Sequence, residues 1–325
     1  MTDKRNLLVA TLTLSALTLM IVAYFAPIWW VSLTAPNYPP EAFPDGIRIH
    51  FHFDHVANGC AVAAQGTRMA GEIIQKDLAG DDERYNPVTD AGGNFDQGAE
   101  GLDCVHEMNT INHYVGMFPI ETGAPVERPL AKFFFGFFAV MLLAFALPAP
   151  KGRMYVLSVG FLAVFVWMIV DQFALAHLEQ QVQHYMLETG RFFKEPERIQ
   201  AWGDTVRHAS IIAIAGLALT MLIVVFGTLK IRSFQLLLAF VPALLPVFFV
   251  VTYAGWLWFF GHNLHPWGAF TVKPFMPTVF GEGKVAQFST FSYPAWGFAL
   301  LALIFICLML ATLIRRKQLR EGCTL

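Results

Sequence analysis

The chain has 325 residues, of which 56% are hydrophobic and 14% are charged, and its formal net charge at pH 7 is −2. Its mean hydropathy is clearly positive. This composition excludes an ordinary soluble domain and predicts an integral, mainly α-helical membrane protein.

Six apolar segments are long enough to cross a bilayer, whose hydrocarbon core of about 30 Å requires roughly 20 apolar residues in a helix. In chain order they are 7–31, 129–148, 154–176, 209–229, 234–260 and 295–314. The first begins like a signal peptide, but no cleavage site follows it, so we expect a retained helix. Pro242 and Pro246 predict a kink in the fifth segment, because proline removes a backbone donor and clashes with the preceding turn.

The basic residues predict that both ends of the chain lie in the cytoplasm. With the N-terminus inside, the inner segments 1–6, 149–153, 230–233 and 315–325 carry ten basic and two acidic residues. The remainder carries 12 basic and 22 acidic residues. Because positive charge collects on the cytoplasmic side, we expect a bacterial inner-membrane protein with N-in/C-in topology. Its location in the lipid bilayer and its acidic outer face exclude nucleic acid as a partner.

This topology divides the chain into seven parts. They are a first helix (1–31), a periplasmic His/Met-rich domain of mixed α/β structure (32–128), two helices (129–176), a periplasmic helical segment (177–208), two helices (209–260), a periplasmic cap rich in proline and aromatic residues (261–294), and a last helix with a basic tail (295–325).

All ten histidines fall on the outer side in this topology. They are His50, His52, His55, His106, His113, His177, His184, His208, His262 and His265. Imidazole is the commonest metal ligand and titrates near neutral pH. A one-sided set of histidines therefore predicts metal or redox chemistry on the outer face.

Residues 47–54 of the first outer segment alternate strictly between apolar and polar side chains. This alternation predicts a strand with one buried face, because successive side chains point to opposite sides. His50 and His52 share the polar face, about 7 Å apart at roughly 3.3 Å per residue. They are candidate metal ligands; the alternative is a solvated polar face.

Cys60 and Cys104 lie in the same outer segment, where an oxidising compartment favours a disulfide over a thiolate metal site. Between them we expect a short amphipathic helix over 60–78 and an acidic insertion over 79–101.

Two histidines and two methionines follow within twelve residues, in the order H-x-M-x4-H-x3-M. Thioether sulfur favours Cu(I), whereas imidazole accepts either oxidation state of copper. The alternative is a packed loop in which the methionines fill gaps. The predicted copper ligands are His106, Met108, His113 and Met117, together with His50 or His52.

A second metal site is a weaker expectation. His177 and His184 are seven residues apart, so they share one face of a predicted helix that would otherwise be an interfacial polar helix. Asp171 is an ionisable group at the edge of an apolar span. The candidate ligands are His177, His184, His262, His265 and Asp171. Haem b held between His177 and His208 is a further alternative.

The block Asn112–Met117 (N-H-Y-V-G-M), preceded by Tyr-Pro-Pro at 38–40 and Phe-Pro-Asp-Gly at 43–46, resembles a poorly characterised family of bacterial inner-membrane proteins. Residues 261–265 and 273–277 are similar to the last outer loop of that family. The resemblance implies an association with the assembly of copper enzymes of the nitrous oxide reductase type. The acidic insertion at 79–101 departs from the family pattern.

Together these patterns predict a protein that holds or delivers copper for a membrane or periplasmic cuproenzyme and is not an enzyme on its own. One alternative is a subunit of a copper- or haem-containing membrane oxidoreductase, either an oxidase or a monooxygenase. A second alternative is a small-solute permease, although few ionisable residues lie within the spans. Hydrolase and nucleotide-loop motifs are absent from the sequence.

Overall fold

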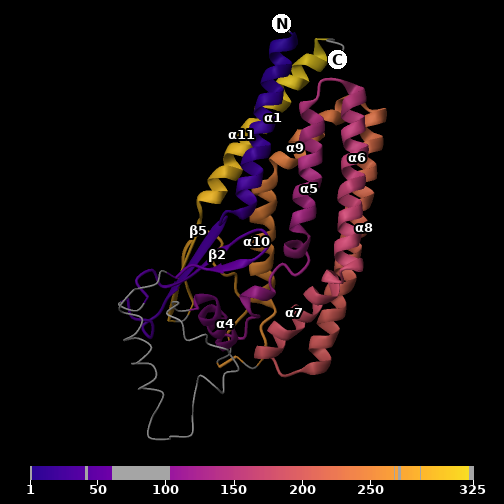
Figure 1. The fold of residues 1–325 in the computed structure, drawn as a ribbon. Helices are drawn as coiled ribbons and strands as arrows, with labels where there is room; N and C mark the ends of the chain where they lie inside the picture. Colours follow the sequence, from indigo (N-terminus) through magenta and orange to yellow (C-terminus); the bar gives the residue numbers. More distant parts are fainter. Residues whose placement is uncertain are drawn as a thin grey trace, which may run out of the picture.

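The computed structural model describes residues 2–40, 43–60, 103–266, 268–269, 272–285 and 287–321. The helix expected over 60–78, apart from Cys60, and the acidic insertion at 79–101 lie outside these ranges. Six helices are long and apolar enough to cross a membrane, so the chain is a multi-pass membrane protein by helix length and hydropathy. Both termini lie at one end of the molecule, and the sheet and α4 lie toward the other, which we call the sheet end (Figure 1).

The six long helices agree with the predicted spans in number and order. They are α1 (Thr2–Phe25), α5 (Glu127–Ala146), α6 (Pro150–Ile169), α8 (Pro196–Lys230), α10 (Leu245–His262) and α11 (Trp296–Arg320). Proline in the first turn of α6, α8 and α10 fits a position whose backbone N–H has no partner in the helix.

Two predicted boundaries were wrong. The first apolar segment does not stay helical to residue 31, because α1 ends at Phe25 and the chain turns through Pro27 into strand β1 (Trp29–Thr34). At the fourth span, α8 begins at Pro196 rather than near residue 209, so the helix continues well beyond its apolar part. Apolarity marks where lipid contact is possible, whereas caps and prolines determine where a helix begins and ends.

The predicted kink in the fifth span is confirmed as a break. A 3₁₀ turn (Arg232–Leu236) leads into α9 (Leu237–Ala243), which contains Pro242, and α10 starts after Leu244. Proline cannot donate the helical hydrogen bond, so the two helices change direction between Pro242 and Pro246.

The strands form one antiparallel sheet with the order β3-β2-β1-β5-β4. Its other members are β2 (Ile47–Phe51), β3 (Val56–Asn58), β4 (Gly281–Val285) and β5 (Phe288–Pro294). The sequence predicted a single strand over 47–54, which corresponds to β2. The structure adds partners from elsewhere in the chain, because the predicted cap at 261–294 supplies β4 and β5. The central pair β1 and β5 continues directly from α1 and into α11.

α1 and α11 pack against each other where they meet this sheet (Figure 1). The Gly297 backbone N–H donates to the Pro27 carbonyl at 3.0 Å, and a Cβ at Gly297 would collide with that oxygen. Glycine thus permits the close approach of the two chain segments.

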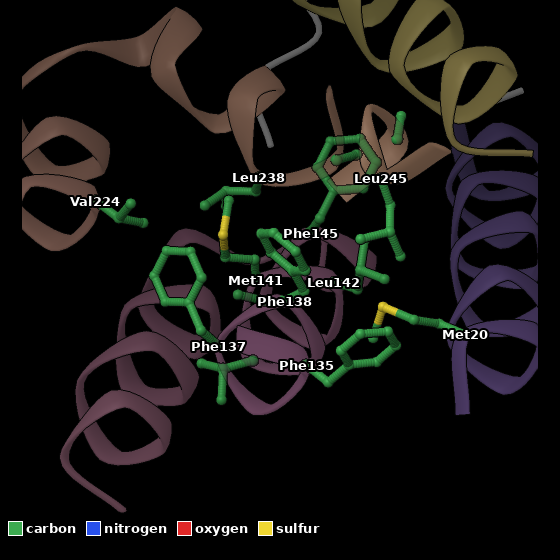
Figure 2. Packing of buried hydrophobic residues seen from close by; sticks show 14 of the residues in the cluster. Met20, Phe135, Phe137, Phe138, Met141, Leu142, Phe145, Val224, Leu238 and Leu245 are labelled. Atoms are coloured by element: carbon green, nitrogen blue, oxygen red, sulfur yellow. The ribbon is translucent and has the colours of Figure 1, made fainter. Parts of the chain in front are cut away.

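Two hydrophobic clusters hold the fold. The helical cluster is centred on the phenylalanine-rich α5, and Figure 2 shows Phe137, Phe138 and Met141 of α5 beside Leu238 of α9. A second cluster lies at the sheet end, where buried residues of β1, β2 and α4 (Cys104–Tyr114) pack together.

Candidate functional site

An apolar cavity of about 620 Å³ lies among α5, α8, α9, α10 and the end of β2. We call it the aromatic cavity, because eleven of its 27 lining residues are Phe, Tyr or Trp. Phe135, Phe137, Phe138 and Leu245 line it and are also members of the helical cluster (Figure 2).

The cavity exists because α8 presents small residues to its aromatic neighbours. Ala213, Gly216 and Thr220 repeat at three- and four-residue spacing, which places them on one face of α8. A Cβ built on Gly216 would meet no atom within 4 Å, whereas α5 and α10 contribute large rings. The small face leaves room that the rings opposite do not fill.

Polar groups gather at one end of this cavity. They are His52, Glu127 and Arg128, with Trp256 donating from Nε1 to Glu127 Oε1 at 3.1 Å. The Arg128 guanidinium donates to the Glu121 carbonyl. Nδ1 of His52 and Nε of Arg128 are buried, and neither has a hydrogen-bond partner among the described residues.

A second, polar chamber of about 280 Å³ adjoins this end and shares Val56 and Arg128 with the aromatic cavity. Its walls include Asp54, His55 and His184, as well as two further acidic residues. The rings of His52 and His55 stack 4.3 Å apart, and His55 Nδ1 lies 2.7 Å from Asp54. The two histidines therefore stand side by side at the junction of an apolar and a polar compartment.

The His52 imidazole favours its neutral form. Partial burial lowers its pKa below the ordinary value of 6.5, and the neighbouring His55 lowers it further. Burial also lowers the pKa of His50, aided by the charge of Arg48. Near pH 7, His52 thus offers one nitrogen as a donor and one as an acceptor.

The four predicted copper ligands of the His/Met block lie in different surroundings. His106 is exposed on α4, whereas Met108 and Met117 are buried with 4% and 6% of their surface exposed, in the sheet-end cluster. Residues two apart on a helix point about 200° away from each other, which separates His106 from Met108. Within the described residues, no three His, Cys, Asp or Glu side chains form a group that could hold a metal.

The structure instead places His113 near His265, which the sequence assigned to different sites. Both rings contact Phe193, at 5.8 and 4.6 Å between ring centroids. His265 is buried, with Nε2 3.2 Å from Glu195 Oε1, and its backbone N–H donates to the Gly116 carbonyl at 2.6 Å. Burial and the proximity of His265 lower the pKa of His113. No spacing in the sequence indicates this pair, because about 150 residues separate its members.

The residues predicted for a second site occupy four separate places, of which the pocket beside His113 holds His265. His177 Nδ1 lies 3.0 Å from Asp171, which also accepts from Lys132 Nζ at 2.8 Å. His184 lies 3.9 Å from Glu188 on α7 (His177–Phe192), and the exposed His262 stacks on Trp258. Asp171 belongs to a π-helical turn (Val170–Ala174) that ends α6, a local geometry common at functional sites.

The predicted disulfide is present in the structure. Cys60 and Cys104 are bonded with their Cα atoms 6.0 Å apart. Asp103 caps α4 by accepting from the backbone N–H groups of Val105 and His106. The bond fixes the start of α4 beside the end of β3, where it supports the sheet-end cluster.

Comparison of the chain with protein-family models, with curated proteins and with solved structures found no match.

Proposed function

We propose that this protein binds a lipid-soluble molecule in the aromatic cavity, with the sheet end facing the periplasm. The cavity itself supports the proposal. Its volume falls in the range of small-molecule sites, about 300–1,000 Å³, and its apolar walls carry a few polar groups at one end. An amphipathic ligand fits this division, with its chain among the rings and its head near His52 and Arg128.

The chain offers a matched pair of glycines to test binding. Gly216 on α8 lines the cavity, whereas Gly255 on α10 does not, and a Cβ at either position meets no atom within 4 Å. We expect Gly216→Leu to fill the cavity without a clash, while Gly255→Leu leaves it unchanged. Wild type and both variants would be purified in mild detergent, and the lipids retained by each would be extracted and compared by mass spectrometry.

The expected result is one retained species that is depleted in Gly216→Leu and kept in Gly255→Leu. Thermal melts of both variants check that the fold is intact. Equal retention in all three proteins, or a bulk-membrane mixture in each, would contradict ligand binding in this cavity.

A second candidate function is copper binding at the periplasmic face, for holding the metal or delivering it to a cuproenzyme. The pair His113 and His265 favours it, because two nearby imidazoles can bind copper in either oxidation state. A contribution from Met117 would require its buried side chain to turn out of the sheet-end cluster.

His113→Phe tests this candidate, since a phenyl ring preserves the contacts with Phe192 and Phe193. We expect wild type loaded with Cu(I) and then desalted to retain about one copper per chain, and the variant to retain much less. His262→Phe serves as the control, because its ring is exposed and stacks on Trp258 instead. The same copper content in wild type and His113→Phe would rule out this pair.

A further inference from the structure

Two unpaired polar atoms stand out at the polar end of the aromatic cavity. His52 Nδ1 and Arg128 Nε are buried without a hydrogen-bond partner in the described part of the chain, and both residues line the same apolar space. Buried polar atoms in folded proteins are nearly always hydrogen-bonded, so a missing partner indicates a ligand or water that belongs there.

The charge at the polar end of the aromatic cavity restricts which ligand head groups can bind there. The carboxylates of Asp54, Glu121 and Glu127 lie close enough to interact with the Arg128 charge. Glu188 adds a further acidic group in the adjoining polar chamber. With His52 neutral, negative charges outnumber positive ones around the cavity end, which disfavours a phosphate or carboxylate head by repulsion.

The shape and chemistry of the walls limit the rest of the ligand. A space of about 620 Å³ suits a ring with one attached chain better than the two chains of a phospholipid. Aromatic side chains prefer stacked or edge-to-face contact with planar unsaturated groups. Phe51 and Phe53 of the β2 end and Tyr253 and Trp256 of α10 supply such rings near the polar end.

We propose that the ligand is a quinone-class lipid, whose uncharged ring oxygens hydrogen-bond to His52 and Arg128 while its isoprenoid chain lies along α5 and α8. This rests on the proposed binding function and names the ligand class for the same cavity. The imidazole of His52 bonds to the Phe25 backbone through its other nitrogen. Nδ1 therefore presents a lone pair that accepts from a quinol hydroxyl, while the Arg128 Nε–H donates to a ring oxygen of either form of the head.

The experiment uses the full-length protein in detergent and a decyl-substituted benzoquinone as the probe. Quinones quench tryptophan fluorescence, and Trp256 lies in the cavity wall, so the saturable part of the quenching that is lost when the cavity is filled reports binding there. We expect saturable quenching in wild type and its loss in Gly216→Leu. In His52→Phe, which keeps an aromatic ring to stack on His55, we expect the reduced quinol form of the probe, measured by its displacement of the quinone, to bind about tenfold more weakly, as for the loss of one hydrogen bond.

His50→Phe is the matched control, because His50 lies in β2, two residues before His52, but does not line the cavity. Its affinity for both forms of the probe should equal that of wild type. Decanoic acid, which carries a chain and an anionic head, should not displace the quinone at equal concentration. If decanoic acid competes equally, or if His52→Phe binds the quinol as tightly as wild type, the assigned head group is wrong.

This result separates the two proposals. If a retained lipid is lost from Gly216→Leu but the benzoquinone gives no saturable quenching, the cavity binds a ligand of another class and the quinone inference fails. If the benzoquinone quenches wild type and Gly216→Leu equally, it binds elsewhere, and the quinone inference fails again.

Discussion

At the scale of single residues, three histidines of the sheet end share one property. Burial lowers the pKa of His50, His52 and His113 below the ordinary value of 6.5. Each is therefore kept neutral by its surroundings near pH 7, which suits hydrogen bonding to an uncharged ligand and also leaves a nitrogen lone pair for a metal.

These lowered values predict that the protein loses stability in mild acid. A histidine with a lowered pKa in the folded state binds fewer protons than in the unfolded chain. Stability is therefore full above pH 6.5 and falls as the pH drops from 6.5 through the lower folded-state value. We expect the Tm at pH 5.5 to be a few degrees below that at pH 7.5, a moderate effect because the rings are only partly buried.

His52→Phe isolates one contribution to this pH dependence, since phenylalanine does not titrate. Its loss of Tm between pH 7.5 and 5.5 should be smaller than that of wild type. A Tm that rises on acidification, or an equal loss of Tm in His52→Phe and wild type, would contradict this account.

Met108 offers a residue-scale test of packing against metal ligation. Its side chain is buried in the sheet-end cluster, so Met108→Ala should lower the free energy of unfolding by about 2–5 kcal/mol. Met108→Leu conserves volume and should cost less than about 1.5 kcal/mol. Chemical unfolding of both variants measures the difference. If Met108→Leu keeps its stability but loses bound copper, the thioether is a ligand after all.

At the scale of elements, the long helices could be predicted from the sequence and the sheet could not. A membrane-spanning helix can be predicted locally, because a continuous run of about 20 apolar residues is long enough to cross the bilayer. The sheet joins β1, β2 and β5, which lie up to 260 residues apart, and the aromatic strand β5 has the same composition as a membrane-surface cap. The pairing of β5 with β1 becomes evident only in the folded structure, where α1 and α11 pack together and bring the two strands side by side.

The candidate site, too, could be predicted from the sequence only in part. Local spacing identified His50, His52 and His113 as residues of interest. The predicted topology identified the cysteine pair, which the structure joins, because it placed both cysteines in one outer segment. The sequence could not reveal the aromatic cavity, because small residues on α8 and rings on α5 and α10 define a space only after the helices assemble. The density of His and Met in residues 106–117 also could not show that the side chains of Met108 and Met117 pack in the sheet-end cluster.

At the scale of elements, we predict how removal of the disulfide changes stability. The disulfide closes a long loop, since Cys60 and Cys104 have a sequence separation of 44, so its removal should lower the free energy of unfolding by about 4 kcal/mol in the chain-entropy model. Alkylation of native protein with and without reductant, followed by mass spectrometry, should reveal two extra modified thiols only after reduction. Two thiols that alkylate freely without reductant would show that the bond does not form in the cell.

At the scale of the whole molecule, both termini lie at the end opposite the sheet (Figure 1). An even number of spans requires this arrangement, and six candidate spans satisfy it. The ends carry a basic excess, including Arg315, which is buried and donates to Asn6 and to the Phe145 carbonyl. The proposed orientation, with the termini in the cytoplasm, places the polar chamber and the disulfide in the periplasm.

Alkaline phosphatase fusions test this orientation, because the enzyme folds actively only where its own disulfides form. A fusion after Gly101, in the segment that the cysteine pair brackets, should be active. One after Lys151, in the short turn between α5 and α6, should be inactive, since that turn lies at the same end as the basic termini. The opposite pattern would place the sheet end in the cytoplasm, where a structural disulfide does not persist. It would contradict the periplasmic copper site and the bond between Cys60 and Cys104 together, yet leave binding in the aromatic cavity open, because a lipid-soluble ligand can enter from either leaflet.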